Sequence, residues 1–76
     1  SNDAIWNELF LTGLRTVWGV SKKQISALGG FVASEKTELL SFQNRGFINE
    51  KNNAFVLTNK GMLFADGISK SFFRVS

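Results

Sequence analysis

Few side chains in this protein could do chemistry. Its 76 residues include no His, no Cys and no Tyr. A general base that works near neutral pH would have to be a carboxylate or a Lys, and the six acidic residues form no clear pair on one face. A zinc site is effectively excluded, because its usual nitrogen and sulfur ligands are missing. We therefore expect no catalytic residue, no cofactor-binding residue and no metal site in this chain.

Three helices are predicted in the first 46 residues, from capping residues and glycines. Ser21 is followed three residues later by Gln24, as in a capping box. Glu35 lies in the first turn of a helix, where the helix dipole favours negative charge. The predicted elements are a helix capped by Asp3 that runs to about Leu14, an extended segment from Arg15 to Val20, a helix from Ser21 to Gly29-Gly30, and a helix from Ser34 to Arg45-Gly46.

The apolar pattern then changes from helical to alternating. Phe47 to Glu50 and Ala54 to Thr58 predict two strands around Lys51-Asn52-Asn53, because Asn tolerates left-handed turn geometry. Thr58 can cap a last helix that runs to about Arg74. This order predicts one α+β domain over residues 1–76, with a winged-helix-like fold of three helices, a short strand and a β-hairpin wing, and an added C-terminal helix.

The composition indicates the class of protein and the cellular compartment to expect. Hydrophobic residues make up 43% of the chain and include eight Phe and two Trp, enough for a core without disulfides. The apolar runs are far shorter than the roughly 20 residues that span a bilayer, so we expect a soluble protein. The lack of Cys favours a reducing, cytoplasmic compartment. Ser1-Asn2 is interpreted as the remnant of a tag before an excised domain.

Two segments resemble a known family. Leu14-Arg15-Thr16, with Gly19 and Val20 after it, is similar to a corner near the start of the C-terminal domain of oxygen-independent coproporphyrinogen III oxidases and related haem chaperones. Leu57-Thr58-Asn59-Lys60-Gly61, with the apolar and small residues after it, is similar to the segment with which those proteins finish. The first similarity is the more specific, because many winged-helix proteins carry the second.

The resemblance implies a larger parent protein, either a radical S-adenosylmethionine oxidoreductase or a haem chaperone, with a barrel that carries a [4Fe-4S] cluster. This domain would then be a non-catalytic accessory that packs on the missing N-terminal catalytic barrel and helps to close the porphyrin or haem cleft. Cluster ligation needs thiolates. Because this chain has none, the cluster and S-adenosylmethionine would have to be held elsewhere in the parent.

Arg15 and Trp18 are the candidate contacts to a porphyrin or to another domain. The guanidinium of Arg15 could pair bidentately with a porphyrin propionate or with a carboxylate of a partner domain. The alternative, which we weigh more heavily, is that Arg15 bonds the free carbonyls at the end of the first helix and Trp18 is a packed aromatic. Met62 is the one common axial haem ligand left, although a lone Met on an apolar helix more often belongs to the core.

Two helices carry more apolar surface than a small domain needs. The apolar residues of the first helix cover about half of its circumference, wider than a one-sided stripe. In the last helix Met62 and Phe73 fall on a different face from the main stripe, which ends at Phe72. Either the core wraps both helices fully, or the end of the chain frays, or these surfaces dock on the missing catalytic domain, and we expect docking. The residues expected to dock are Trp6, Phe10, Leu11, Met62 and Phe73.

A DNA-binding domain of a transcriptional regulator is the alternative function that a winged helix suggests. Within the third helix, however, Glu35 and Glu38 offset the charges of Lys36 and Arg45. Few cations remain for the phosphate contacts that drive affinity, so we expect no nucleic-acid partner. The candidate contacts would be Lys36, Thr37, Gln43, Asn44, Arg45 and Lys51.

Overall fold

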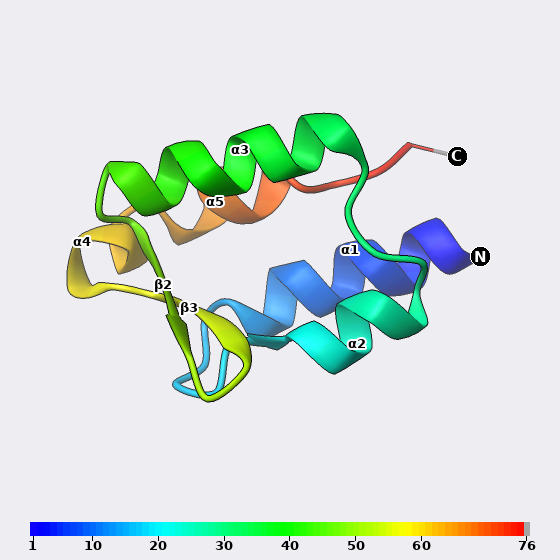
Figure 1. Cartoon of the computed structure of the whole chain (residues 1–76), viewed down its shortest axis with the longest axis horizontal. Helices are drawn as coiled ribbons and strands as arrows, with labels where there is room; N and C mark the ends of the chain where they lie inside the picture. The colour runs from blue at the N-terminus through cyan, green and yellow to red at the C-terminus, as the bar shows by residue number, and fades with distance from the viewer. Residues whose placement is uncertain (76) are drawn as a thin grey trace.

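Five helices and a three-stranded antiparallel sheet make up the part of the chain that the computed structural model describes, residues 1–75 (Figure 1). The predicted α+β, winged-helix-like class is confirmed. The elements are α1 (Asn2–Gly13), β1 (Val20–Ser21), α2 (Lys22–Ala27), α3 (Ala33–Asn44), β2 (Ile48–Lys51), β3 (Ala54–Leu57), α4 (Asn59–Met62) and α5 (Ala65–Lys70).

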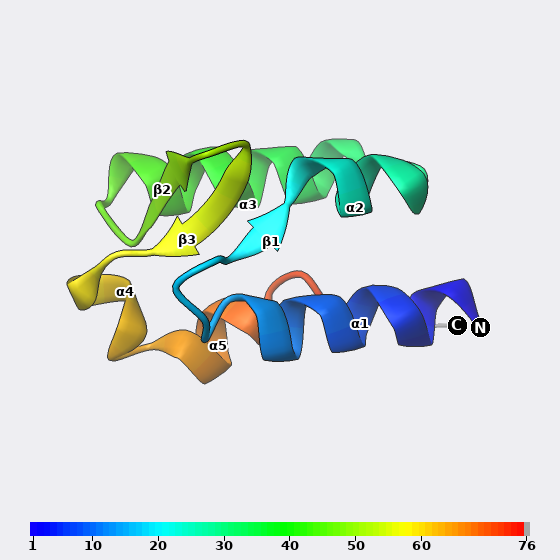
Figure 2. The same cartoon turned by 90° about the horizontal axis from the view of Figure 1, so that it is seen from below.

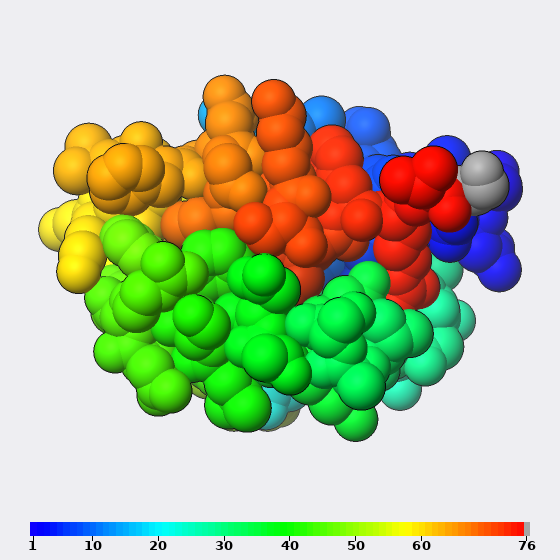
Figure 3. All heavy atoms as spheres, turned by 90° about the horizontal axis from the view of Figure 1, so that it is seen from above, coloured from blue at the N-terminus to red at the C-terminus, as the bar shows by residue number. Residues whose placement is uncertain are grey.

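The elements form two layers with the core between them. Figure 2 shows α1 and α5 on one side, and α2, α3 and the sheet on the other. The core is dominated by large aromatic and aliphatic side chains, of which Trp6, Phe10, Leu14, Val20, Ile48 and Phe72 are at most 1% exposed. Figure 3 shows α5 and the segment after it lying alongside α3, so the end of the chain closes one side of the core.

The helix starts follow from local capping, with two corrections. The Ser1 hydroxyl accepts the Ala4 N–H at 3.3 Å, so Ser1 rather than Asp3 caps α1. The Ser21 hydroxyl accepts the Gln24 N–H at 3.1 Å and caps α2, as predicted. Helix α3 starts at Ala33 with Val32 as its N-cap, rather than at Ser34, and the Glu35 carboxylate accepts the Val32 N–H at 2.9 Å.

The hairpin is confirmed, with a shift of one residue in β2. Strand β3 lies in the middle of the sheet and pairs with β1 and β2. Ala54 pairs with Lys51 across the turn, and Asn52 and Asn53 take φ values of 52° and 60°. Because Asn adopts left-handed geometry more readily than most residues, the two asparagines allow the tight return of the chain.

The predicted extended segment from Arg15 to Val20 is wrong. A series of turns occupies most of it, with the Thr16 N–H bonded to the Gly13 carbonyl at 3.0 Å, and pairing with β3 begins only at Val20. The β-branched residues favour a strand, but a threonine hydroxyl that bonds the nearby backbone offers the chain a turn instead.

The single C-terminal helix predicted from Thr58 to Arg74 is also wrong, because the helix breaks at Leu63 and Phe64. Phe64 leaves helical geometry, with φ −122° and ψ 25°, and its N–H bonds the Gly61 carbonyl at 2.9 Å. After this bend α5 packs on α1, where the Phe72 ring stacks on Phe10 with ring centres 4.9 Å apart.

The Arg74 side chain links the end of the chain to three other segments through hydrogen bonds and a contact with an aromatic ring. Its guanidinium donates to both Glu35 carboxylate oxygens at 2.8 and 2.7 Å and to the Gly30 carbonyl at 3.0 Å, and it lies 3.4 Å from the centre of the Trp6 ring. The Asn7 amide bonds both the N–H and the carbonyl of Arg74. Burial raises the pKa of Glu35, but the bonds from Arg74 and Val32 and the guanidinium charge together hold this pKa below its ordinary value.

None of the helices within residues 1–75 has both the length and the apolar character needed to cross a membrane.

Candidate functional site

The corner after α1 is formed by Leu14 and Thr16 of the Leu-Arg-Thr motif and by Gly19, which follows the motif. Leu14 is completely buried. The Thr16 hydroxyl donates to the Gly13 carbonyl at 2.8 Å and accepts the Gly19 N–H at 3.1 Å. Gly19 has a φ of 70°, and a Cβ there would overlap the Phe55 carbonyl oxygen. The motif therefore encodes a rigid turn.

This corner exposes the residues between its fixed positions. Val17 and Trp18 are 81% and 78% exposed, among the most exposed large apolar side chains of the described chain. The expectation that Trp18 is a packed aromatic is wrong. Because the turn is held by Thr16 and Gly19, both side chains are presented to solvent on a backbone that is already ordered.

A second corner lies at the start of α4 and is also held by a threonine hydroxyl and a closely packed glycine. The Thr58 hydroxyl accepts the Gly61 N–H at 3.0 Å and donates to the Gly46 carbonyl at 2.6 Å. A Cβ at Gly61 would overlap the Phe47 carbonyl oxygen, so α4 approaches the start of the hairpin as only glycine permits. The residues after this corner are exposed, with values of 43%, 80% and 56% for Met62, Leu63 and Phe64.

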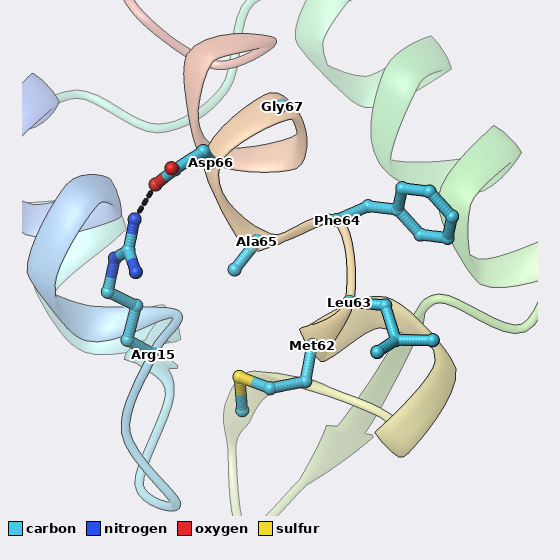
Figure 4. A pocket seen from close by; sticks show the side chains of 7 residues that line it. All are labelled: Arg15, Met62, Leu63, Phe64, Ala65, Asp66 and Gly67. Atoms are coloured by element: carbon cyan, nitrogen blue, oxygen red, sulfur yellow. Dashed lines mark ion pairs between the residues drawn. The ribbon is translucent and has the colours of Figure 1, made fainter.

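Arg15 faces the second corner across an open pocket of about 360 Å³ (Figure 4). Its guanidinium pairs with the Asp66 carboxylate at the start of α5. The favoured expectation that Arg15 bonds the carbonyls at the end of α1 is wrong, because Arg15 pairs with Asp66 instead and two of those carbonyls accept other side chains. Ser69 donates to the Phe10 carbonyl and Thr16 to the Gly13 carbonyl. The pocket is lined by Arg15, Met62, Leu63, Phe64, Ala65, Asp66 and Gly67.

The predicted docking residues do not form one surface. Trp6 and Phe10 are 0% and 1% exposed, so their assignment to a docking surface is corrected. The segment after α5 covers them: the Phe72 ring stacks on Phe10, and the Trp6 indole donates to the Phe72 carbonyl at 2.8 Å. Leu11 is half-buried. Met62 lines the pocket, whereas Phe73 lies in the segment after α5 and does not line it.

Leu63 and Asp66 line the pocket and Val17 lies on the first corner, and none of the three is a predicted site residue. Val17 was assigned to a strand, and Leu63 to a continuous helix. Asp66 belongs to the segment after Gly61 that resembles the family, but it was given no role there. Only the break before α5 brings Asp66 to the end of α1, so no local pattern marks this pair.

The helix in the recognition position presents little to nucleic acid. Within α3 the Glu35 carboxylate forms an ion pair with Arg74. The guanidinium of Arg45 lies over the rings of Phe42 and Phe47, with its carbon 4.9 and 5.2 Å from their centres. Glu38 is exposed on the same helix. DNA binding is not favoured by this arrangement of charge.

The donor set does not fit a metal cluster. Iron–sulfur clusters are held by Cys thiolates, and the chain has no Cys and no His. Among residues 1–75, no three carboxylates come together as a metal would require. Any cluster of a larger protein must therefore take its ligands from residues outside this chain.

The chain was compared with known protein families, curated proteins and solved structures. The model of a family described as the HemN C-terminal domain matches residues 1–64, which include both corners and the hairpin. Searches of curated proteins and of solved structures gave no match.

Proposed function

Because the chain belongs to the HemN C-terminal domain family, we propose that it is a non-catalytic accessory domain of a larger radical S-adenosylmethionine protein. In this proposal the domain packs on the N-terminal catalytic barrel of a coproporphyrinogen III oxidase-like protein and helps to close its porphyrin or haem cleft. The parent is either an oxidase or a haem chaperone. The cluster and S-adenosylmethionine, bound by the barrel, would supply the radical chemistry.

The observation that carries this proposal is the exposure of large apolar side chains at both corners, which face each other across the pocket between Arg15 and Leu63. We define the docking face as Arg15, Val17, Trp18, Met62 and Leu63. Exposed apolar side chains that gather beside a charged group mark interaction sites. Trp and Arg are also the residues that most often dominate binding energy.

The rigidity of the corners supports the same function. Ordering a flexible loop on binding costs free energy, and a surface that is already ordered avoids that cost. Thr16 and Thr58 each bond their own turn through the side-chain hydroxyl, and Gly19 and Gly61 each lie against a carbonyl of another element. In this proposal the family motifs maintain the geometry of the docking face and take no part in a reaction.

Arg15 would act by exchanging its partner. Its pair with Asp66 is half exposed, with side-chain exposures of 47% and 70%, and such pairs contribute only about 0–1 kcal/mol. The guanidinium can therefore leave Asp66 at little cost for a carboxylate of the barrel or a porphyrin propionate, which it can bind bidentately. Trp18 would contact the same partner.

Hydroxyl-radical footprinting tests the docking. The 76-residue chain and the full-length parent are labelled side by side, and oxidation is measured residue by residue. Trp18 and Met62 should be oxidised readily in the isolated chain and protected in the parent. Leu40, which is exposed on α3 and is not a residue of the docking face, serves as the internal control. Equal labelling of Trp18 and Met62 in both proteins would refute the docking.

The role of Arg15 needs a second readout. Arg15→Ala in the full-length parent should weaken porphyrin or haem retention, measured by the Soret absorbance, while the thermal stability of the protein stays unchanged. Lys36→Ala, which removes an exposed cation of α3 outside the docking face, is the matched control. If Arg15→Ala changes neither retention nor stability, the assigned role is wrong.

A further inference from the structure

Two cations are fixed on an aromatic ring beside the docking face. The Lys60 ammonium lies 4.8 Å from the centre of the Phe47 ring and donates to the Arg45 carbonyl at 3.0 Å. The Arg45 guanidinium lies over the same ring and over Phe42. Neither cation forms an ion pair within residues 1–75. We call Arg45 and Lys60 the cation pair.

Phe64 connects the cation pair to the docking face. Its ring meets the Phe47 ring edge-on, with centres 5.6 Å apart, and the same residue lines the pocket beside Leu63. Figure 4 shows the Phe64 side chain pointing away from the Arg15–Asp66 pair and toward α3. We call these apolar residues, from Leu63 and Phe64 at the pocket to Phe47 under the cation pair, the strip. It is continuous from the pocket to the rings that carry the cation pair.

The charge along this strip is unbalanced. Arg15 at one edge is matched by Asp66, the one acidic residue that lines the pocket. The cation pair at the other edge has no such partner. A partner that covers the strip would take water from two charges, and buried charges are costly unless an opposite charge meets them.

We propose that the strip is recognised by an apolar surface of the catalytic barrel with carboxylates on its rim, which pair with Arg45 and Lys60. This inference rests on the proposed function and adds the chemistry of the opposing surface. The apolar centre fills the pocket between Arg15 and Leu63. The carboxylates set the orientation of the domain, because opposite charges at a rim steer association and exclude misplaced partners.

Lysine acetylation of the full-length parent tests whether carboxylates of the barrel cover Lys60. Lys60 should react about tenfold more slowly in the parent than in the isolated chain, as expected for an interaction of about 1.4 kcal/mol. Lys36 and Lys51 are exposed, lie outside the strip and should react equally in both proteins. A carbodiimide, which joins only amines and carboxylates in direct contact, should link Lys60 to an Asp or Glu of the barrel.

Charge reversal provides the matched variants. Lys60→Glu in the parent should raise the oxidation of Met62 in the footprint, because like charges would then face each other across the rim. Lys36→Glu makes the same charge change on α3 away from the strip and should leave Met62 protected. Both substitutions are at exposed positions, and circular dichroism verifies that each variant is folded.

The outcomes separate this inference from the proposed function. If Trp18 and Met62 are protected in the parent while Lys60 reacts freely and forms no link to the barrel, the carboxylate rim is refuted and the docking stands. If Trp18 and Met62 are not protected, the proposed function fails first. Concentration-dependent protection of Lys60 in the isolated chain would assign the strip to a second copy and overturn the inference.

Discussion

Replacing Glu35 by Gln removes the charge that holds the C-terminal segment in place. The Glu35 carboxylate accepts two hydrogen bonds from the Arg74 guanidinium and one from the Val32 N–H. A Gln side chain keeps the volume but offers one acceptor oxygen. If that oxygen keeps its bonds to Val32 and to one Arg74 nitrogen, the Gln NH₂ faces the other nitrogen, and two donors oppose each other.

The expected loss of stability is moderate to large for a domain of this size. The residue Glu35 is 7% exposed and the Arg74 side chain 21% exposed, so water replaces the lost bonds only in part. Leaving a partly buried charge without its partner costs about 1–3 kcal/mol. A change of 1 kcal/mol moves the melting temperature of such a domain by about 4–8 °C. We expect Glu35→Gln to lower the melting temperature by about 5–20 °C at pH 7.

The effect should depend on pH in a defined direction. The pKa of Glu35 in the folded chain lies below its ordinary value of 4.5, so the ionised carboxylate stabilises the fold above about pH 4.5. This contribution is lost as the pH falls through the lower folded-state pKa. The difference in melting temperature between the wild-type chain and Glu35→Gln should therefore be full near neutral pH and shrink below about pH 4.5.

Thermal unfolding followed by circular dichroism over a pH series measures both effects. Glu38→Gln is the matched control, because Glu38 is exposed on the same helix, and its effect should stay within about 0.5 kcal/mol. Two results would refute the reasoning: melting temperatures that agree at pH 7, or a difference that persists unchanged at acid pH.

Three further variants test the corners and the core. Gly19→Ala should destabilise the chain by more than the roughly 1–2 kcal/mol of left-handed backbone alone, because its Cβ overlaps the Phe55 carbonyl; denaturant unfolding that shows no change would contradict this. Arg15→Ala should change the stability of the isolated chain by less than about 1 kcal/mol, since its pair with Asp66 is half exposed. Phe72→Ala should cost about 3–5 kcal/mol, enough to leave much of the chain unfolded by near-ultraviolet circular dichroism, whereas Phe72→Leu should remain folded.

Features fixed by neighbouring residues could be predicted from the sequence. Ser21 caps α2, Gly46 with a φ of 79° follows the end of α3, and the two asparagines turn the hairpin, because each of these features depends on a few adjacent backbone groups. The family motifs were recognisable for the same reason. Their Thr and Gly residues make bonds within the turn, or approaches at a fixed position, that other residue types cannot make.

Where local preferences conflict, the sequence was not sufficient. Val17 and Trp18 favour a strand by type, but the Thr16 hydroxyl holds the backbone in a turn. The pattern after Thr58 reads as one helix, but the chain bends at Phe64. In both places a glycine also lies close to a distant part of the chain, Gly19 to Phe55 of β3 and Gly61 to Phe47, and such approaches cannot be read from local residue preferences.

By itself, the sequence determined the family, the fold class and the absence of cluster ligands, since these follow from residue types and short spacings. Only the tertiary structure decided which apolar residues face outward. The segment after α5 covers part of the wide apolar face of α1, so Trp6 and Phe10 belong to the core, whereas Ile5 on the same helix is 56% exposed. The same packing brings Asp66 to Arg15. Periodicity gives the faces of one helix, whereas the partner of each face depends on how distant segments meet in space.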